Sequence, residues 1–197
     1  MGEWMVQSAE WKDWLEGRAR CFWLYGIPGA GKTALISHLI NETQKHCDTS
    51  LPSHACVYYY CYFAHNQAET KPLLRWLIDQ LCRKARSIPA EVKGLYEYGG
   101  EPSLASFLEA LMRVLERFEV VYMVVDAIGE SKLREDLLEV LQIVTTDPHY
   151  KKLRLLASSR DHVDIRNTMT KVSTSISMDN PHVQADIKKY VHPTILK

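Results

Sequence analysis

The stretch Gly26 to Thr33 reads GIPGAGKT and directly follows the apolar run Cys21 to Tyr25. Such a sequence is typical of a phosphate-binding loop, in which a strand leads into a tight glycine turn and a helix begins at the lysine. The apolar residues after Thr33 recur with helical spacing, as this motif requires. A glycine-rich turn without a ligand is the alternative. The strand before the stretch and the helix after it favour a P-loop, which restricts the chain to an α/β fold.

The residues of this loop have separate expected roles toward a nucleoside triphosphate or diphosphate. Glycines allow backbone torsions and a close approach to phosphate that a side chain would block, and backbone N–H groups converge on the anion. Lys32 is expected to lie between the β- and γ-phosphates, and the Thr33 hydroxyl to bind Mg²⁺. The predicted nucleotide-binding residues are Gly26, Ile27, Pro28, Gly29, Ala30, Gly31, Lys32, Thr33 and Ala34.

Strand-like segments recur along the rest of the chain and alternate with amphipathic helices. Besides Cys21–Tyr25, strands are expected at Ala55–Ala64, Val120–Val125, Leu153–Ser159 and Lys171–Met178. Helices are expected at residues 8–18, from 32 to about 46, 71–86, from 103 to about 118, from about 132 to 144, and from 181 to about 190, with a linker at 94–102. This alternation predicts a three-layer α/β fold with a mainly parallel five-stranded sheet.

The composition is that of one ordinary soluble domain. The chain has 197 residues, of which 46% are hydrophobic and 24% charged, and its formal net charge is zero. This balance gives no global electrostatic attraction to nucleic acid or to an anionic membrane, so neither is expected as a partner. The apolar runs are too short to span a bilayer, and the N-terminus lacks a secretory signal. The five cysteines are unclustered and are expected to be buried free thiols in the cytoplasm.

Two acidic residues follow the apolar strand Val120–Val125, and an arginine follows the strand Leu153–Ser159. Asp126 is expected to orient Mg²⁺, usually through water, although it could simply cap the strand end. Glu130 could act as a general base toward the attacking water, or be an exposed loop carboxylate. In P-loop ATPases with sheet order 5-1-4-3-2, the fourth strand ends beside the γ-phosphate. Arg160 could therefore pair with that phosphate, or simply be solvated at the surface.

Taken in order, these motifs resemble those of the NACHT domains of fungal NOD-like receptors, in the STAND class of signalling ATPases. The similar segments are AEWKDWLEGRARCFWLYGIPGAGKTALIS, KPLLRWLIDQL, VVYMVVDAIGE, LRLLASSR and DIKKYV. The resemblance implies the sheet order 5-1-4-3-2, ATP or ADP with Mg²⁺ as ligands, an ADP-bound inactive state, and self-association of the full-length receptor with ATP. It also implies a lead-in helix at residues 1–20, a P-loop core at 21–180 and the start of a truncated helical subdomain at 181–197.

The chain departs from this family at one position that bears on catalysis. The family has an acidic pair where this chain has Gly129 and Glu130. Magnesium binding by Asp126 should survive, but slow hydrolysis is expected because one acid is missing. The sequence therefore predicts a nucleotide-dependent switch. A P-loop phosphotransferase or an AAA-like motor is the alternative. The sequence has no NKxD or LSGGQ motif, which disfavours an ordinary GTPase or a transporter ATPase.

Overall fold

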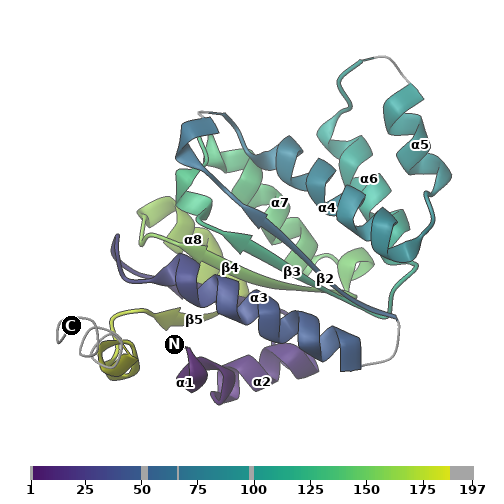
Figure 1. The fold of residues 1–197 in the computed structure, drawn as a ribbon. Helices are drawn as coiled ribbons and strands as arrows, with labels where there is room; N and C mark the ends of the chain where they lie inside the picture. Colours follow the sequence, from purple (N-terminus) through teal and green to yellow (C-terminus); the bar gives the residue numbers. More distant parts are fainter. Residues whose placement is uncertain (1, 50–52, 66, 98–99, 187–197) are drawn as a thin grey trace, which may run out of the picture.

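A parallel β-sheet forms the centre of the fold (Figure 1). The computed structural model describes residues 2–49, 53–65, 67–97 and 100–186. Within them the strands are β1 (Cys21–Tyr25), β2 (His54–Tyr60), β3 (Val120–Asp126), β4 (Leu153–Ser159) and β5 (Thr174–Ser177). They lie in the order β2-β3-β4-β1-β5, and each neighbouring pair is parallel. The predicted five-stranded P-loop fold and its order 5-1-4-3-2 are confirmed.

Helices cover both faces of this sheet, which gives the three layers (Figure 1). One face packs against α1 (Glu3–Val6), α2 (Ala9–Glu16) and α3 (Lys32–Thr49). The other packs against α4 (Thr70–Ala85), α6 (Leu104–Leu115), α7 (Arg134–Thr146) and α8 (Val163–Val172), with α5 (Ala90–Glu97) beside α6. The short 3₁₀ helices are η1 (Phe63–His65), η2 (Ile128–Glu130) and η3 (Pro148–Tyr150).

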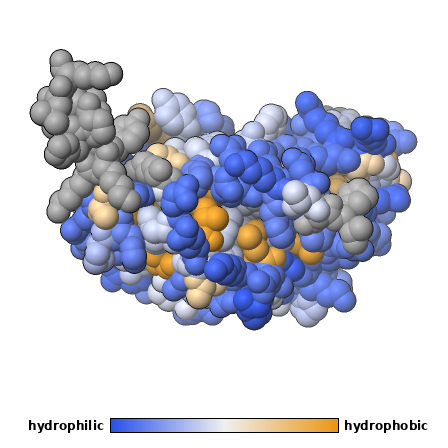
Figure 2. Space-filling view, turned by 60° about the horizontal axis from the view of Figure 1, so that its bottom comes forward, coloured by the Kyte–Doolittle hydropathy of each residue, from blue (hydrophilic) through white to orange (hydrophobic). Residues whose placement is uncertain are grey.

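The strands are apolar on both sides because both faces of the sheet are buried. Successive side chains of a strand point to opposite faces. Phe22 and Leu24 therefore belong to the core on the α1–α3 side, while Cys21 and Trp23 belong to the core on the opposite side. Figure 2 shows that hydrophilic residues cover most of the α1–α3 side, with small separate apolar areas between them. The helices thus turn their apolar sides inward. Because the strands are parallel, the carboxyl ends of β1, β3 and β4 lie at the same edge of the sheet.

The N-terminal helix α2 is part of this core. The Ser8 hydroxyl accepts a hydrogen bond from the backbone N–H of Trp11 at 3.1 Å, and Gly17 ends the helix with φ of 82°. The buried Trp14 ring packs against the edge of Tyr122 in β3, with 5.1 Å between ring centroids. The amphipathic helix predicted here is therefore present, while α1 before it was not predicted.

Three predicted boundaries were wrong. The strand predicted to reach Ala64 ends at Tyr60, because Tyr60 pairs with Asp126, the last residue of the neighbouring strand β3. Lys171, predicted to open the fifth strand, belongs to α8, a helix that was not predicted. Gly94, predicted to open a linker, lies in α5, where packing against α6 outweighs the low helix propensity of glycine. Residues 181–186 are helical, and the rest of the predicted last helix lies outside the described residues.

All five thiols are free and buried, as predicted. None of the helices in the described ranges has the length and apolar character needed to cross a membrane.

Candidate functional site

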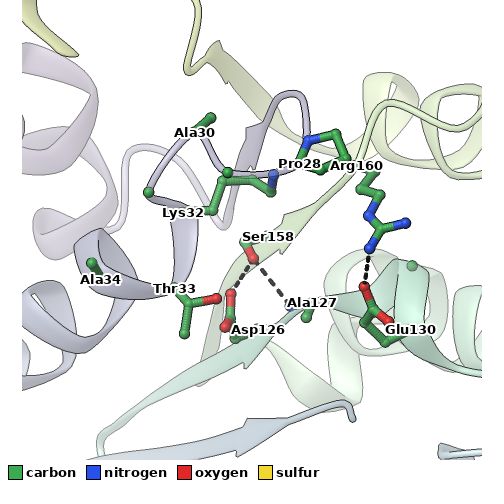
Figure 3. Close-up of a pocket in the computed structure, with 13 residues that line it drawn as sticks. Pro28, Ala30, Lys32, Thr33, Ala34, Asp126, Ala127, Glu130, Ser158 and Arg160 are labelled. Carbon is green, nitrogen blue, oxygen red and sulfur yellow. Dashed lines mark hydrogen bonds and ion pairs between the residues drawn. The ribbon is translucent and has the colours of Figure 1, made fainter. Parts of the chain in front are cut away.

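A cavity of about 340 Å³ lies where β1, β3 and β4 end (Figure 3). Its lining brings together most of the predicted site residues, although they come from three separate parts of the sequence. The lining residues are Pro28, Gly29, Ala30, Gly31, Lys32, Thr33, Ala34, Asp126, Ala127, Gly129, Glu130, Ser158 and Arg160. Of the predicted residues, Gly26 and Ile27 do not line the cavity.

The fold requires glycine at different positions of the P-loop for different structural reasons. Gly29 and Gly31 have φ of 78° and 80°, the left-handed region that favours glycine, so the turn depends on them. Gly26 does not have a positive φ. A Cβ at Gly26 would lie 2.8 Å from Cβ of Met178, so close packing against Met178 requires a glycine at this position.

Lys32 begins α3 and bends back over its own loop. Its Nζ donates to the carbonyl oxygens of Gly26 and Ile27, at 2.8 Å each. Although Gly26 and Ile27 do not line the cavity, their carbonyl oxygens hold the Lys32 ammonium in place. Burial, followed by the positive charge of Arg160, lowers the pKa of Lys32, and the carboxylates of Asp126 and Glu130 oppose this shift. The charged side chains of all three cavity segments thus act on one another.

Asp126 is almost fully buried at the end of β3, with 2% of its surface exposed. The Ser158 hydroxyl at the end of β4 donates to Asp126 Oδ1 and accepts from the backbone N–H of Ala127 at 3.0 Å. This arrangement follows from the parallel register, in which Val125 pairs with Ala157. The role of Ser158 was not predicted. The available signal was the polar run Ser158–Arg160 at the end of an apolar strand.

The oxygen atoms in this part of the cavity suit a magnesium ion. Figure 3 shows the Thr33 hydroxyl turned toward Asp126, and both residues line the cavity. A hydroxyl and a carboxylate are hard oxygen ligands of the kind Mg²⁺ takes, usually together with water and substrate phosphates. Since Ser158 donates to one oxygen of Asp126, the hydrogen bond also fixes how the carboxylate is turned.

Glu130 and Arg160, which both line the cavity, form an ion pair with 2.8 Å between Glu130 Oε1 and Arg160 Nη2 (Figure 3). Their side chains are 21% and 47% exposed, respectively. The sequence left open whether each was a free surface group, and the structure instead pairs them. Both residues line the cavity, so this pair forms part of its wall.

The space beside Gly129 is partly filled. A Cβ built at Gly129 would lie 3.2 Å from His162 Cδ2 and 3.7 Å from Ile165 Cδ1. The carbonyl of Gly129 accepts from Arg134 Nη1 at 3.1 Å, and Arg134 also pairs with Asp164 at 3.0 Å. The position where the family has an acid is therefore held by α7 and α8 and faces a histidine ring.

Solved structures with a similar fold are P-loop proteins of low sequence identity. The Walker-type ATPase PABY2304 of Pyrococcus abyssi has a TM-score of 0.63 and 13% identity, covering 99% of this chain and 59% of that one. The Aeropyrum pernix ORC1 protein, solved in complex with DNA, has a TM-score of 0.59 and 14% identity, covering 92% and 46%. At this identity the similarity shows the fold.

Sequence relatives carry the family assignment. The vegetative incompatibility protein HET-E-1 of Podospora anserina is 23% identical over 207 residues, which cover 98% of this chain. The chain spans only 15% of the length of that protein. A family described as Nephrocystin 3, N-terminal, matches residues 1–160. The resemblance to NACHT domains is confirmed: the chain belongs to the Nephrocystin 3 N-terminal family and is a NACHT-type domain with the fold of P-loop ATPases.

Proposed function

We propose that this chain binds ATP and ADP with Mg²⁺, hydrolyses ATP slowly, and acts as the nucleotide-binding module of a signalling switch. The observation that carries the proposal is the convergence of the P-loop, two carboxylates and an arginine on one cavity. The similarity to HET-E-1, a vegetative incompatibility protein, favours signalling over metabolism. We further propose that residues 21–180 form the nucleotide-binding core and that residues 1–20 are its lead-in segment.

The N-terminus of α3 and the P-loop turn supply the site for the phosphates. Backbone N–H groups at a helix N-terminus are free to bind an anion, and the helix dipole favours one. Lys32 is held by two carbonyl oxygens at 2.8 Å, so its ammonium can exchange these partners for phosphate oxygens with a small movement. A charge-assisted bond to phosphate is stronger than a bond to a neutral carbonyl, which favours this exchange.

Asp126 and Thr33 would hold the magnesium ion, and Ser158 would keep the Asp126 carboxylate turned toward it. Bound Mg²⁺ neutralises charge on the β- and γ-phosphates. Glu130 is the residue that can accept a proton from an attacking water. Turnover should be slow, because Glu130 is engaged by Arg160 and Gly129 provides no second carboxylate.

The Glu130–Arg160 pair gives the site a way to distinguish ATP from ADP. A guanidinium that pairs with γ-phosphate oxygens must loosen its contact with Glu130, and the contact can re-form after hydrolysis. ATP would therefore both move Arg160 and free the base, whereas ADP would leave the pair intact. Any effect on self-association must come from this differential interaction, because a ligand shifts an equilibrium only by its difference in affinity for the two states.

Calorimetry and a turnover assay on the purified chain test this proposal. ATP and ADP should both bind, more tightly with Mg²⁺ than in chelator, and turnover should stay below about 1 s⁻¹, the low end of typical enzymes. Light scattering of the longer receptor containing this module should give a larger mass with ATP than with ADP. Efficient phosphate transfer to a small-molecule acceptor would instead favour a phosphotransferase and overturn the switch.

A further inference from the structure

Glu69 carries a fully buried carboxylate close to the site but outside the cavity lining. It stands at the N-terminus of α4, on the connection that follows β2. A buried carboxylate is costly unless hydrogen bonds satisfy its oxygen atoms. The hydrogen bonds to the Glu69 carboxylate therefore indicate which parts of the structure this residue holds together.

A side chain of β2 and a side chain of η1 hold this carboxylate. The Tyr59 hydroxyl donates to Oε2, and His65 Nδ1 lies 2.9 Å from Oε1. Burial and the hydrogen bond to Glu69 raise the pKa of Tyr59, so its hydroxyl remains protonated and able to donate. The carboxylate thus fixes residue 69 between the end of β2 and the helix η1.

The backbone of Glu69 in turn holds the loop after β3. Its N–H donates to the Ser131 hydroxyl at 3.1 Å, and that hydroxyl donates to the carbonyl of Lys132 at 3.0 Å. The N–H of Lys132 donates to the carbonyl of Gln67 at 3.1 Å. Ser131 is 3% exposed and directly follows Glu130. The connection before α4 therefore donates a hydrogen bond to the loop that carries Glu130 and accepts one from it.

The loop needs such support because its backbone is strained at both ends. Ala127 and Leu133 have φ of 58° and 49°, a region that costs a residue with a side chain about 1–2 kcal/mol. Such conformations persist where surrounding contacts determine them. Within the loop, the N–H of Glu130 bonds the carbonyl of Ala127 at 2.8 Å, and the contacts through Ser131 come from outside it.

We propose that Glu69 is a positioning residue for Glu130: held by Tyr59 and His65, it fixes Ser131 and thereby the place of the Glu130 carboxylate at the cavity. The inference rests on the proposed function for the role of Glu130. Glu69 does not line the cavity and acts through the loop. Nucleotide affinity, which depends on the P-loop, should be independent of it.

Glu69→Ala and Ser131→Ala, alone and together, test this pathway, with Glu91→Ala as a control that removes a distant ion pair with Arg113. Each single change should raise amide exchange of residues 127–132 and lower kcat for ATP about tenfold, since small misplacements of a catalytic group have effects of this order or larger. KM and the affinity for ADP should stay within about twofold. The double variant should be no worse than the worse single one, because both changes break one pathway.

Unchanged exchange in residues 127–132 with Glu69→Ala would overturn the proposal, as would additive effects in the double variant or an equal loss of ADP affinity. If Glu69→Ala does not fold, Tyr59→Phe removes one hydrogen bond to the carboxylate and should raise exchange in the same residues. Exchange is read without nucleotide, so it decides the positioning role even if the wild-type chain binds no ATP. That last result would instead overturn the proposed function.

Discussion

The P-loop and the loop Ala127–Leu133 both contribute residues to the cavity, but they are held in different ways. The P-loop takes its left-handed turns at Gly29 and Gly31, and its lysine bonds carbonyl oxygens of the same loop. The second loop takes left-handed conformations at Ala127 and Leu133, where a side chain makes them costly. Its hydrogen bonds reach β4 through Ser158 and the connection before α4 through Glu69.

This difference separates the two tasks of the site. Under the proposed function, phosphate binding would depend on a continuous stretch of sequence and should tolerate change elsewhere in the fold. Discrimination of ATP from ADP, and hydrolysis, would depend on contacts between segments that are far apart in the sequence. We therefore expect changes in the P-loop to remove binding, and changes in the second loop or its supports to alter turnover with binding kept.

The largest expected effect is that of Lys32→Ala on nucleotide binding. The ammonium is the main positive charge that the P-loop offers the phosphates, so affinity for ATP should fall at least about a hundredfold, the scale of losing one strong charged contact. Calorimetry with ATP and Mg²⁺ measures this change. Lys45→Ala is the matched control on α3, because Lys45 pairs with Glu42 at 2.7 Å and lies away from the cavity. Equal affinity in both variants would contradict the assignment.

The difference between the two loops also explains which parts of the site could be predicted from the sequence and which could not. The GIPGAGKT motif predicts its loop because the conformation is set by the glycines it contains. Asp126 at a strand end was predicted because it directly follows an apolar run, whereas the strand order was predicted from the resemblance to NACHT domains. The pairing of Glu130 with Arg160, the support of Asp126 by Ser158, and the packing of Met178 on Gly26 were not predicted, because each depends on which segments the fold brings together.

Ser158→Ala should have the next largest effect. It leaves the buried Asp126 oxygen and the N–H of Ala127 without their partner, which costs about 1–3 kcal/mol of unfolding free energy. The carboxylate also loses its fixed orientation, so the gain in ATP affinity on adding Mg²⁺ should shrink. Binding measured in chelator should be unchanged. An unchanged magnesium dependence would show that Ser158 does not orient the metal ligand.

Breaking the Glu130–Arg160 pair should alter discrimination more than stability. The pair is partly exposed, so either single change should alter the unfolding free energy by less than about 1 kcal/mol. Arg160→Ala should reduce the preference for ATP over ADP, since the γ-phosphate loses its guanidinium. Glu130→Gln removes the carboxylate that competes with the γ-phosphate for Arg160, so it should raise that preference while lowering turnover. Parallel titrations and phosphate release measure both, and the same loss in the two variants would contradict the separate roles.

Gly129→Asp tests whether the missing acid limits hydrolysis. The new carboxylate would stand next to Glu130, and we expect turnover to rise a few-fold at saturating ATP, below the factor typical of a full general base. Its Cβ requires the His162 ring to move slightly, because the two would lie 3.2 Å apart. Gly129→Ala carries the same steric change without the charge. A rate no higher than that of Gly129→Ala would show that the missing acid does not limit turnover.

The smallest expected effects come from two single substitutions, one glycine to alanine in the P-loop and one alanine to glycine in the loop Ala127–Leu133. Gly29→Ala meets no atom within 4 Å, so its cost is the positive φ alone, about 1 kcal/mol. Ala127→Gly removes a similar strain but frees the unfolded chain, and should gain up to about 1 kcal/mol. Urea unfolding of the two variants should therefore shift in opposite directions. If Ala127→Gly is destabilising instead, its methyl group contributes packing that offsets the strain. Ala127 would then be in the left-handed region at little net cost, and the contrast between the loops would rest on their hydrogen bonds.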